Sequence, residues 1–106
     1  MYVKVTSVDD IKEDGIYPFV VGDFQIIIIR VGSDFFAFED RCSHQDMPLS
    51  EGGEIDRDKY ILTCGWHGAT FSLRTGNNLS LPAFEPIRKF ELKIEDGLIY
   101  VDVDED

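Results

Sequence analysis

The amino-acid sequence predicts an all-β domain. Runs of β-branched and aromatic residues recur between turn-forming glycine, asparagine and aspartate residues, and no stretch keeps a helical period for long enough to compete. The clearest pattern lies near the end, where apolar and charged residues alternate from Phe90 to Glu95, before Asp96-Gly97 and a second apolar run. That pattern is typical of an antiparallel hairpin with one buried face and a two-residue turn.

The first third of the chain predicts three strands. Residues 2–6 alternate apolar and polar side chains, and Ser7 after them can cap a short turn. Residues 16–21 and 24–31 form two further extended runs, separated by a Gly-Asp turn. The four consecutive isoleucines at 26–29 show no alternation. A β-branched run of this kind is expected in a strand that is covered on both faces.

Predicted strand ends coincide with the two cysteines. Residues 35–38 form an aromatic strand that ends shortly before Cys42. Residues 59–63 predict a short strand leading to Cys64, and residues 70–73 predict a strand that follows it. Both cysteines should therefore lie in loops between strands, where a rigid scaffold commonly holds functional groups.

Length and charge limit the possible functions. A chain of 106 residues with 43% hydrophobic residues can bury one core, so residues 1–106 are expected to form a single domain. Acidic residues outnumber basic ones by 21 to 10, and the net charge of -11 disfavours nucleic acid and anionic membranes as partners. An acidic surface usually indicates only good solvation, although it can also dock a basic protein. No segment resembles a leader or a bilayer-spanning helix, so a cytoplasmic protein is expected.

The only two cysteines and two histidines of the chain lie in two short motifs. "CSHQDMPLSEG" begins at Cys42 and contains His44, and "CGWHGATF" begins at Cys64 and contains His67. Thiolate sulfur and imidazole nitrogen together suit zinc or iron–sulfur chemistry. Structural zinc sites usually group like ligands, whereas each motif here mixes one cysteine with one histidine. The mixture fits two irons better, with the cysteines on one and the histidines on the other, and structural zinc stays the alternative.

These motifs resemble the paired cluster-binding loops of bacterial Rieske-type ferredoxins. The resemblance is carried by "FEDRCSHQDMPLSEG" and "CGWHGATFSLRTG", and "LPAFEPIRKFELKIEDGLIYV" is similar to the family's proline-containing third loop and C-terminal hairpin. The family implies a Rieske-type fold, an antiparallel β-sandwich-like base with an inserted cluster-binding subdomain of two loops at approximately residues 40–83. It also implies one [2Fe-2S] cluster per chain, held by Cys42, His44, Cys64 and His67.

The resemblance further implies an electron carrier and not an enzyme. Such ferredoxins serve multicomponent aromatic-ring-hydroxylating dioxygenases, so the implied role is to pass single electrons from an NAD(P)H-dependent flavin reductase to a terminal oxygenase. The sequence itself shows no phosphate loop, mononuclear iron triad or paired acid and base. A small transient carrier is expected to be a monomer. Two alternatives stay open: the small Rieske subunit of an assimilatory nitrite reductase-like oxidoreductase, and a structural zinc module.

Neighbours of the ligands indicate a low redox potential. High-potential Rieske proteins place a serine and a tyrosine hydroxyl near the cluster sulfurs, where this chain has Ala69 and Phe71. Without those donors, we expect a midpoint about 150 mV below zero. Proline often follows the second cysteine in the family, whereas this chain has Gly65, which is expected to give the loop more backbone freedom. Met47 and Trp66 are candidates for an exposed apolar rim around the histidines.

Overall fold

The computed structural model describes residues 1–12, 15–41, 48–65, 68–79 and 86–103. Within them the backbone forms ten strands and one single-turn 3₁₀ helix. In chain order the elements are β1 (Tyr2–Ser7), η1 (Val8–Asp10), β2 (Ile16–Val21), β3 (Phe24–Val31), β4 (Asp34–Glu39), β5 (Glu54–Asp56), β6 (Ile61–Thr63), β7 (Thr70–Ser72), β8 (Lys89–Phe90), β9 (Leu92–Glu95) and β10 (Leu98–Asp102). The all-β prediction is therefore confirmed.

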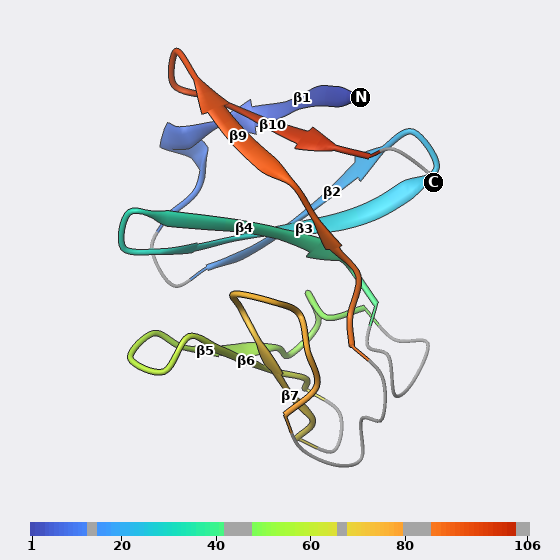
Figure 1. Ribbon diagram of the computed structural model, residues 1–106, viewed down its shortest axis with the longest axis vertical. Coiled ribbons are helices and arrows are strands. Elements are labelled where there is room, and N and C mark those ends of the chain that lie inside the picture. Colours follow the sequence, from blue (N-terminus) through green and yellow to red (C-terminus); the bar gives the residue numbers. More distant parts are fainter. Residues whose placement is uncertain (13–14, 42–47, 66–67, 80–85, 104–106) are drawn as a thin grey trace.

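The strands form three antiparallel sheets that are stacked one above another (Figure 1). The outer sheet has the order β1-β10-β9, the central sheet β2-β3-β4-β8, and the loop sheet β5-β6-β7. In Figure 1 the central sheet crosses the middle of the molecule, with the outer sheet above it and the loop sheet below it. Both other sheets can therefore pack against the central sheet, one on each face.

Strand β3 carries the isoleucine run through the middle of this stack. All four side chains, Ile26, Ile27, Ile28 and Ile29, are fully buried. Successive side chains of a strand point to opposite faces of the sheet. Ile26 and Ile28 accordingly join a buried cluster with residues of the outer sheet, and Ile27 and Ile29 join a second cluster with residues of the loop sheet. The expectation that this strand is covered on both faces is confirmed.

The two clusters, which we call the outer core and the inner core, divide the buried hydrophobic side chains between them. The outer core consists of Ile11, Val21, Ile26, Ile28, Ala37, Phe90, Ile99 and Val101. The inner core consists of Ile27, Ile29, Val31, Phe38, Leu49, Leu62, Cys64, Ala69, Phe71, Leu73 and Ile87. Full burial of one large aliphatic side chain contributes about 1.5–3 kcal/mol, so both cores matter to the free energy of folding.

The C-terminal hairpin forms with the predicted turn. Leu98 pairs with Glu95 at the end of the two strands, which leaves Asp96 and Gly97 as the two turn residues. Their φ angles are 53° and 77°, respectively. A type I′ turn requires positive φ at both positions, and aspartate followed by glycine is a preferred pair there.

The strand before this hairpin differs from the prediction. Residues 89 and 90 form β8, which pairs with β4 of the central sheet, and only β9 pairs with β10. The chain thus changes sheets at Glu91, whose carbonyl accepts a 2.8 Å hydrogen bond from the Asp102 N–H. Phe90 lies in the outer core, and Leu92 packs against the same core from the outer sheet. Because the central sheet and the outer sheet border the same core, the alternation of apolar residues in the sequence continues across the change from one sheet to the other.

The sequence predicts only part of the loop sheet. Strand β6 begins at Ile61, two residues later than predicted, because Lys59 and Tyr60 belong to the preceding turn. Tyr60 has a φ of 55°, in the left-handed region, which cannot continue a strand. Its hydroxyl donates a 2.6 Å hydrogen bond to the Asp34 carboxylate and so ties this turn to the central sheet. The same hydrogen bond raises the pKa of the Tyr60 phenol above its ordinary value.

Strand β5 of the loop sheet has no counterpart among the strands predicted from the sequence.

The single helical turn, η1, begins as predicted. The Ser7 hydroxyl oxygen accepts a 3.2 Å hydrogen bond from the Asp9 N–H, as expected of an N-cap. Across the described ranges, no helix is long and apolar enough to cross a membrane.

The first and last described residues meet on the outer sheet. Strand β1 pairs with β10. The N-terminal ammonium of Met1 donates a 2.7 Å hydrogen bond to the Asp102 carboxylate, and the Val103 N–H donates one of 3.2 Å to the Met1 carbonyl. In Figure 1 the outer sheet lies across the central sheet from the loop sheet. Both ends of the described chain are therefore remote from the loop sheet.

We expect Ile27→Ala and Ile28→Ala to destabilise different parts of the molecule. Each removes a buried aliphatic side chain and should cost about 2–5 kcal/mol of the free energy of unfolding. Native-state hydrogen exchange should show faster exchange in β6 and β7 for Ile27→Ala, and in β9 and β10 for Ile28→Ala. Equal changes in both sheets for both variants would show that the two cores open as one unit.

Candidate metal centre

Both ligand motifs lie between strands, as the sequence predicts. The first motif lies between β4 and β5, and the second lies between β6 and β7. Cys64 is the one predicted ligand among the described residues; it follows β6 directly and is 2% exposed. The remaining predicted site residues lie outside the described ranges, namely Cys42, His44 and His67, with the rim candidates Met47 and Trp66.

The hairpin of β6 and β7 fixes the backbone at Cys64. Thr63 pairs with Thr70 at the end of these strands, and one residue further on the Cys64 N–H donates a 2.7 Å hydrogen bond to the Ala69 carbonyl. Ala69 and Cys64 both lie in the inner core. The base of the second loop is thus held by backbone pairing and by packing at the same time, which gives the Cys64 thiol a defined starting position.

The two motif loops touch each other through two glycines. A Cβ atom at Gly65 would lie 2.7 Å from both the carbonyl carbon and the carbonyl oxygen of Gly52, and 2.9 Å from the carbonyl oxygen of Glu51. A side chain fits there only if one of the loops moves. Gly65 therefore permits close packing of the end of the first motif on the start of the second. This role replaces the expectation that Gly65 chiefly loosens its loop.

A buried carboxylate closes the first loop at its base. Asp40 follows β4 directly, is 8% exposed, and is the one buried charged residue in the described part of the chain. Its carboxylate accepts hydrogen bonds from the Ser50 N–H at 2.8 Å and from the Ser50 hydroxyl at 2.7 Å. The Asp40 N–H donates to the Gln25 carbonyl at 2.8 Å and so anchors the carboxylate to β3. Positions 40 and 50 are thereby fastened together across the segment that contains Cys42 and His44.

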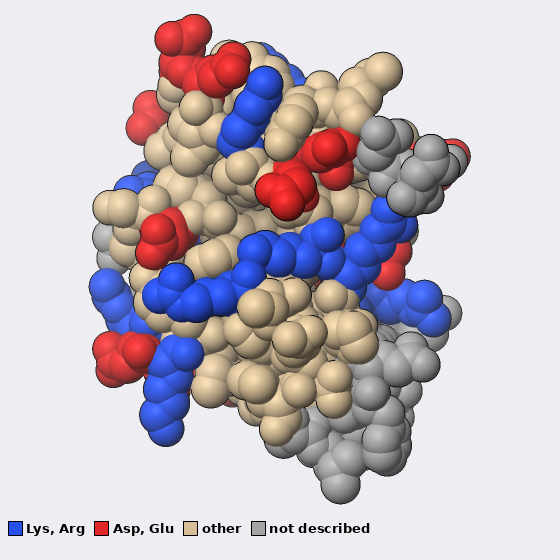
Figure 2. Space-filling model, viewed as in Figure 1, with Lys and Arg blue, Asp and Glu red and all other residues tan. Residues whose placement is uncertain are grey.

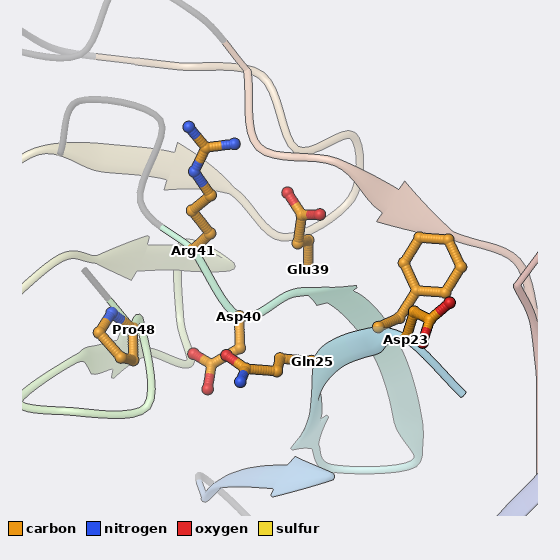
Figure 3. Close-up of a pocket in the computed structure, with 7 residues that line it drawn as sticks. Asp23, Gln25, Glu39, Asp40, Arg41 and Pro48 are labelled. Carbon is orange, nitrogen blue, oxygen red and sulfur yellow. The ribbon is translucent and has the colours of Figure 1, made fainter. Parts of the chain in front are cut away.

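Asp40 also lines a small pocket beside this loop (Figure 3). The pocket has a volume of about 230 Å³, and Gln25, Arg41 and Pro48 contribute to its walls. In Figure 3 the Arg41 side chain points away from the Asp40 carboxylate. Both carboxylate oxygens already accept hydrogen bonds from Ser50. The carboxylate is therefore engaged in holding the loop, and the pocket is the space beside this contact.

Sequence reasoning identified neither Asp40 nor Ser50. The available signal is a carboxylate two residues before Cys42, and a serine at the end of the same motif. Aspartate and serine are both common in exposed turns. Their presence at positions 40 and 50 therefore does not predict whether the two side chains are buried against each other or exposed to solvent. Leu49, next to Ser50, is fully buried in the inner core. Its burial draws the end of the first loop inward and brings Ser50 to the carboxylate.

Comparison with known proteins identifies the family. Residues 1–91 match the model of the Rieske [2Fe-2S] domain. Over 101 residues the chain is 38% identical to the ferredoxin component of biphenyl 2,3-dioxygenase from Rhodococcus jostii (strain RHA1), a match that covers 95% of this chain and 92% of that protein. The chain belongs to the Rieske [2Fe-2S] domain family.

Solved ferredoxin structures share the fold. The ferredoxin of carbazole 1,9a-dioxygenase from Nocardioides aromaticivorans IC177 superposes with a TM-score of 0.92 at 25% identity, over 98% of this chain and 99% of that chain. A chain from a complex of reduced oxygenase and oxidised ferredoxin in carbazole 1,9a-dioxygenase gives a TM-score of 0.87 at 32% identity, over 99% of this chain and 95% of that one. The Rieske-type fold expected from the sequence is confirmed.

These similarities define the chain as a ferredoxin, an electron carrier and not a catalytic oxygenase, with one [2Fe-2S] cluster. They do not favour a nitrite reductase subunit or a structural zinc module. The residues present fit the cluster, because two thiols and two imidazoles are the donors that it requires, and the Cys64 thiol is buried where the two loops touch. When bound, the cluster supplies reversible one-electron transfer.

We expect Gly65→Ala to impair cluster loading more than overall stability. The added methyl group would collide with the Gly52 backbone and push the loops apart. Gly22→Ala is a matched control, because Gly22 has a φ of 61° and open space around it, so alanine there should cost about 1–2 kcal/mol through backbone strain alone. Iron and sulfide content after reconstitution should fall for Gly65→Ala only. Full loading of Gly65→Ala would mean that the loops can separate without consequence.

We expect the variants Asp40→Asn and Ser50→Ala to distinguish the effect of the Asp40 charge on the midpoint potential from the effect of closing the first loop. Both weaken the contact at the base of the first loop and should lower the free energy of unfolding by about 1–3 kcal/mol. Asp40→Asn also removes a negative charge two residues from Cys42, so it should raise the midpoint potential, whereas Ser50→Ala keeps that charge and should not raise it. A redox titration with a chemical unfolding curve for each variant makes the comparison. An equal rise in midpoint for both would assign the effect to loop movement instead.

Proposed function

We propose that this ferredoxin passes single electrons from an NAD(P)H-dependent flavin reductase to the terminal oxygenase of an aromatic-ring-hydroxylating dioxygenase system. Support comes from the biphenyl dioxygenase ferredoxin component, which is 38% identical over 95% of this chain. Further support comes from the similar chain of the carbazole dioxygenase complex, in which ferredoxin and oxygenase occur together. We further propose that it works as a cytoplasmic monomer and binds neither nucleic acid nor membranes, in keeping with its net charge of -11.

In the proposed centre, Cys42 and Cys64 bind one iron, and His44 and His67 bind the other. The observation that carries this assignment is the burial of Cys64 at the contact between the two motif loops. Each loop has to supply one ligand to each iron, so the two loops must lie against each other. The packing of Gly65 on the Gly52 backbone meets that requirement.

The domain division proposed from the sequence is consistent with the placement of the strands. We assign residues 1–106 to one Rieske domain, with a cluster-binding subdomain at approximately residues 40–83. The three strands of the loop sheet, β5 to β7, lie within that range, and so do both ligand motifs. The strands outside it build the outer and central sheets, which form the base.

The surroundings of Cys64 support a low potential. Ala69 and Phe71 are fully buried and carry no hydroxyl group, and Thr70 between them is only partly buried, as the alternation of a strand requires. Donors that stabilise added negative charge raise the potential, and neither buried side chain can donate. The buried carboxylate of Asp40 acts in the same direction, because it adds negative charge beside the first loop.

A redox titration of the purified protein tests this proposal. We expect a [2Fe-2S] electron paramagnetic resonance signal in the reduced state and a midpoint about 150 mV below zero. Ala69→Ser places a hydroxyl in the buried position next to the second loop and should raise the midpoint by tens of millivolts, whereas Thr70→Ser keeps the existing hydroxyl and serves as the control. A wild-type midpoint well above zero would contradict the low-potential assignment, and a colourless protein with zinc would contradict the ligand assignment.

A further inference from the structure

Four basic side chains gather into one band on this acidic protein. Arg74 accepts a 2.5 Å hydrogen bond at its carbonyl from the Lys89 ammonium, and Lys89 follows Arg88 in the chain. The Arg88 carbonyl accepts from the Glu39 N–H at 2.9 Å, and the Glu39 carbonyl accepts from the Arg41 N–H at 2.8 Å. These contacts bring Arg41, Arg74, Arg88 and Lys89, the basic band, close together in the fold, with Glu39 between Arg88 and Arg41. All four basic side chains are exposed. Figure 2 shows lysine and arginine side chains in a continuous band across the middle of this face.

Aromatic rings hold three of these cations in place. The Arg74 guanidinium lies 4.1 Å from the centre of the Tyr60 ring, and the Lys89 ammonium lies 5.8 Å from that of Phe36. Arg88 lies over two phenylalanine rings, at 5.0 Å and 4.9 Å. Such contacts leave the charged group at the surface while restricting the side chain. A partner that binds these charges therefore loses less side-chain entropy than it would with freely rotating lysines.

The segment that contains Arg74 and the second ligand motif lacks acidic residues. Although the chain has 21 Asp and Glu residues, none occurs between positions 60 and 84, and the second ligand motif lies inside that segment. Its exposed described residues beside β7 include Thr75, Asn77 and Leu79, the last of which is 52% exposed. In Figure 2 an uncharged area borders the band on the side of the loop sheet. At its other end the band reaches Arg41, the residue directly before Cys42.

We propose that the basic band and this uncharged area form a docking surface for an acidic face of a redox partner protein. The net charge of -11 suggests the opposite, namely a basic partner. At physiological ionic strength, however, charges are screened over about 8 Å, whereas the molecule measures 39 by 31 by 20 Å. A partner in contact with this face therefore experiences the band more strongly than the acids of remote faces. Basic charges around an uncharged centre match the usual anatomy of a protein interface.

This inference builds on the electron-carrier function, because the surface lies beside both ligand motifs. A docked partner would approach the cluster from the side of the loop sheet. Acidic residues elsewhere on the surface would discourage docking in other orientations. The basic band would thus determine the orientation of the docked partner as well as attract it.

Single-charge variants of the holoprotein test the proposal. Lys89→Gln and Arg74→Gln remove charges from the band, and Lys93→Gln is the matched control, because the Lys93 ammonium also lies over aromatic rings, at 4.6 Å and 5.6 Å, but on the outer sheet. The probe is a short poly-L-glutamate peptide, titrated calorimetrically at low salt. We expect each band variant to weaken binding roughly two- to fivefold and the control to leave it unchanged. Lys89→Arg should restore binding.

A second experiment measures the electrostatic influence of the basic band near the cluster, with two oxidants of opposite charge. In stopped-flow experiments the reduced protein gives one electron to an oxidant, either ferricyanide, which is an anion, or hexaamminecobalt(III), which is a cation. The iron(III) or cobalt(III) of the oxidant is reduced to the +2 state. Band variants should slow the reaction with ferricyanide and speed the reaction with hexaamminecobalt(III), while Lys93→Gln changes neither. Failure of the peptide to bind, or equal effects of all three substitutions on binding, would overturn the docking proposal. Peptide binding needs no electron transfer, so that failure is distinguishable from failure of the carrier function.

Discussion

The burial of β3 on both faces is the constraint on which the rest of the structure depends. Among the described residues, the outer sheet and the loop sheet share no buried cluster, and each has its own cluster against one face of the central sheet. The isoleucine run supplies side chains to both clusters from a single strand. Because Cys64 belongs to the inner core, the position of this proposed ligand depends on side chains more than thirty residues earlier in the sequence.

Backbone contacts hold the described ends of the two ligand loops in place. The Cys64 N–H binds the Ala69 carbonyl at the base of one loop, and the Gly65 backbone lies against that of Gly52 where the loops meet. Among the described residues a charged side chain also takes part, namely Asp40, whose carboxylate accepts hydrogen bonds from the backbone and side chain of Ser50. Contacts of this kind fix the bases of both loops through the protein's own atoms.

The sequence was most informative where a pattern has one physical meaning. Aspartate followed by glycine between apolar runs specifies a hairpin turn, and four isoleucines without alternation specify a strand with two buried faces. The change of sheet at Glu91 left no trace in the sequence, because both sheets border one core and the apolar period continues across it. Strand β5 is three residues long, too short to show a period.

The same limit applies to the candidate site. The proposed ligands were selected by residue type and spacing, because few groups bind metals and their combination is distinctive. The residues that hold the loops are a glycine, an aspartate and a serine, which are common in every turn. Their roles arise from burial and from neighbours far apart in the sequence, and only the folded arrangement of Asp40 beside Ser50, or of Gly65 against Gly52, reveals them.

The meeting of Met1 and residues 102–103 on the outer sheet has a consequence for how such a unit can be built into larger proteins. Strands β1 and β10 are neighbours, and the Met1 ammonium binds the Asp102 carboxylate. A linker attached next to β1 or β10 would leave from the outer sheet, which lies across the central sheet from the loop sheet (Figure 1). Covalent attachment and electrical contact are therefore spatially independent. The unit can therefore be joined to another protein through the outer sheet without covering the loop sheet.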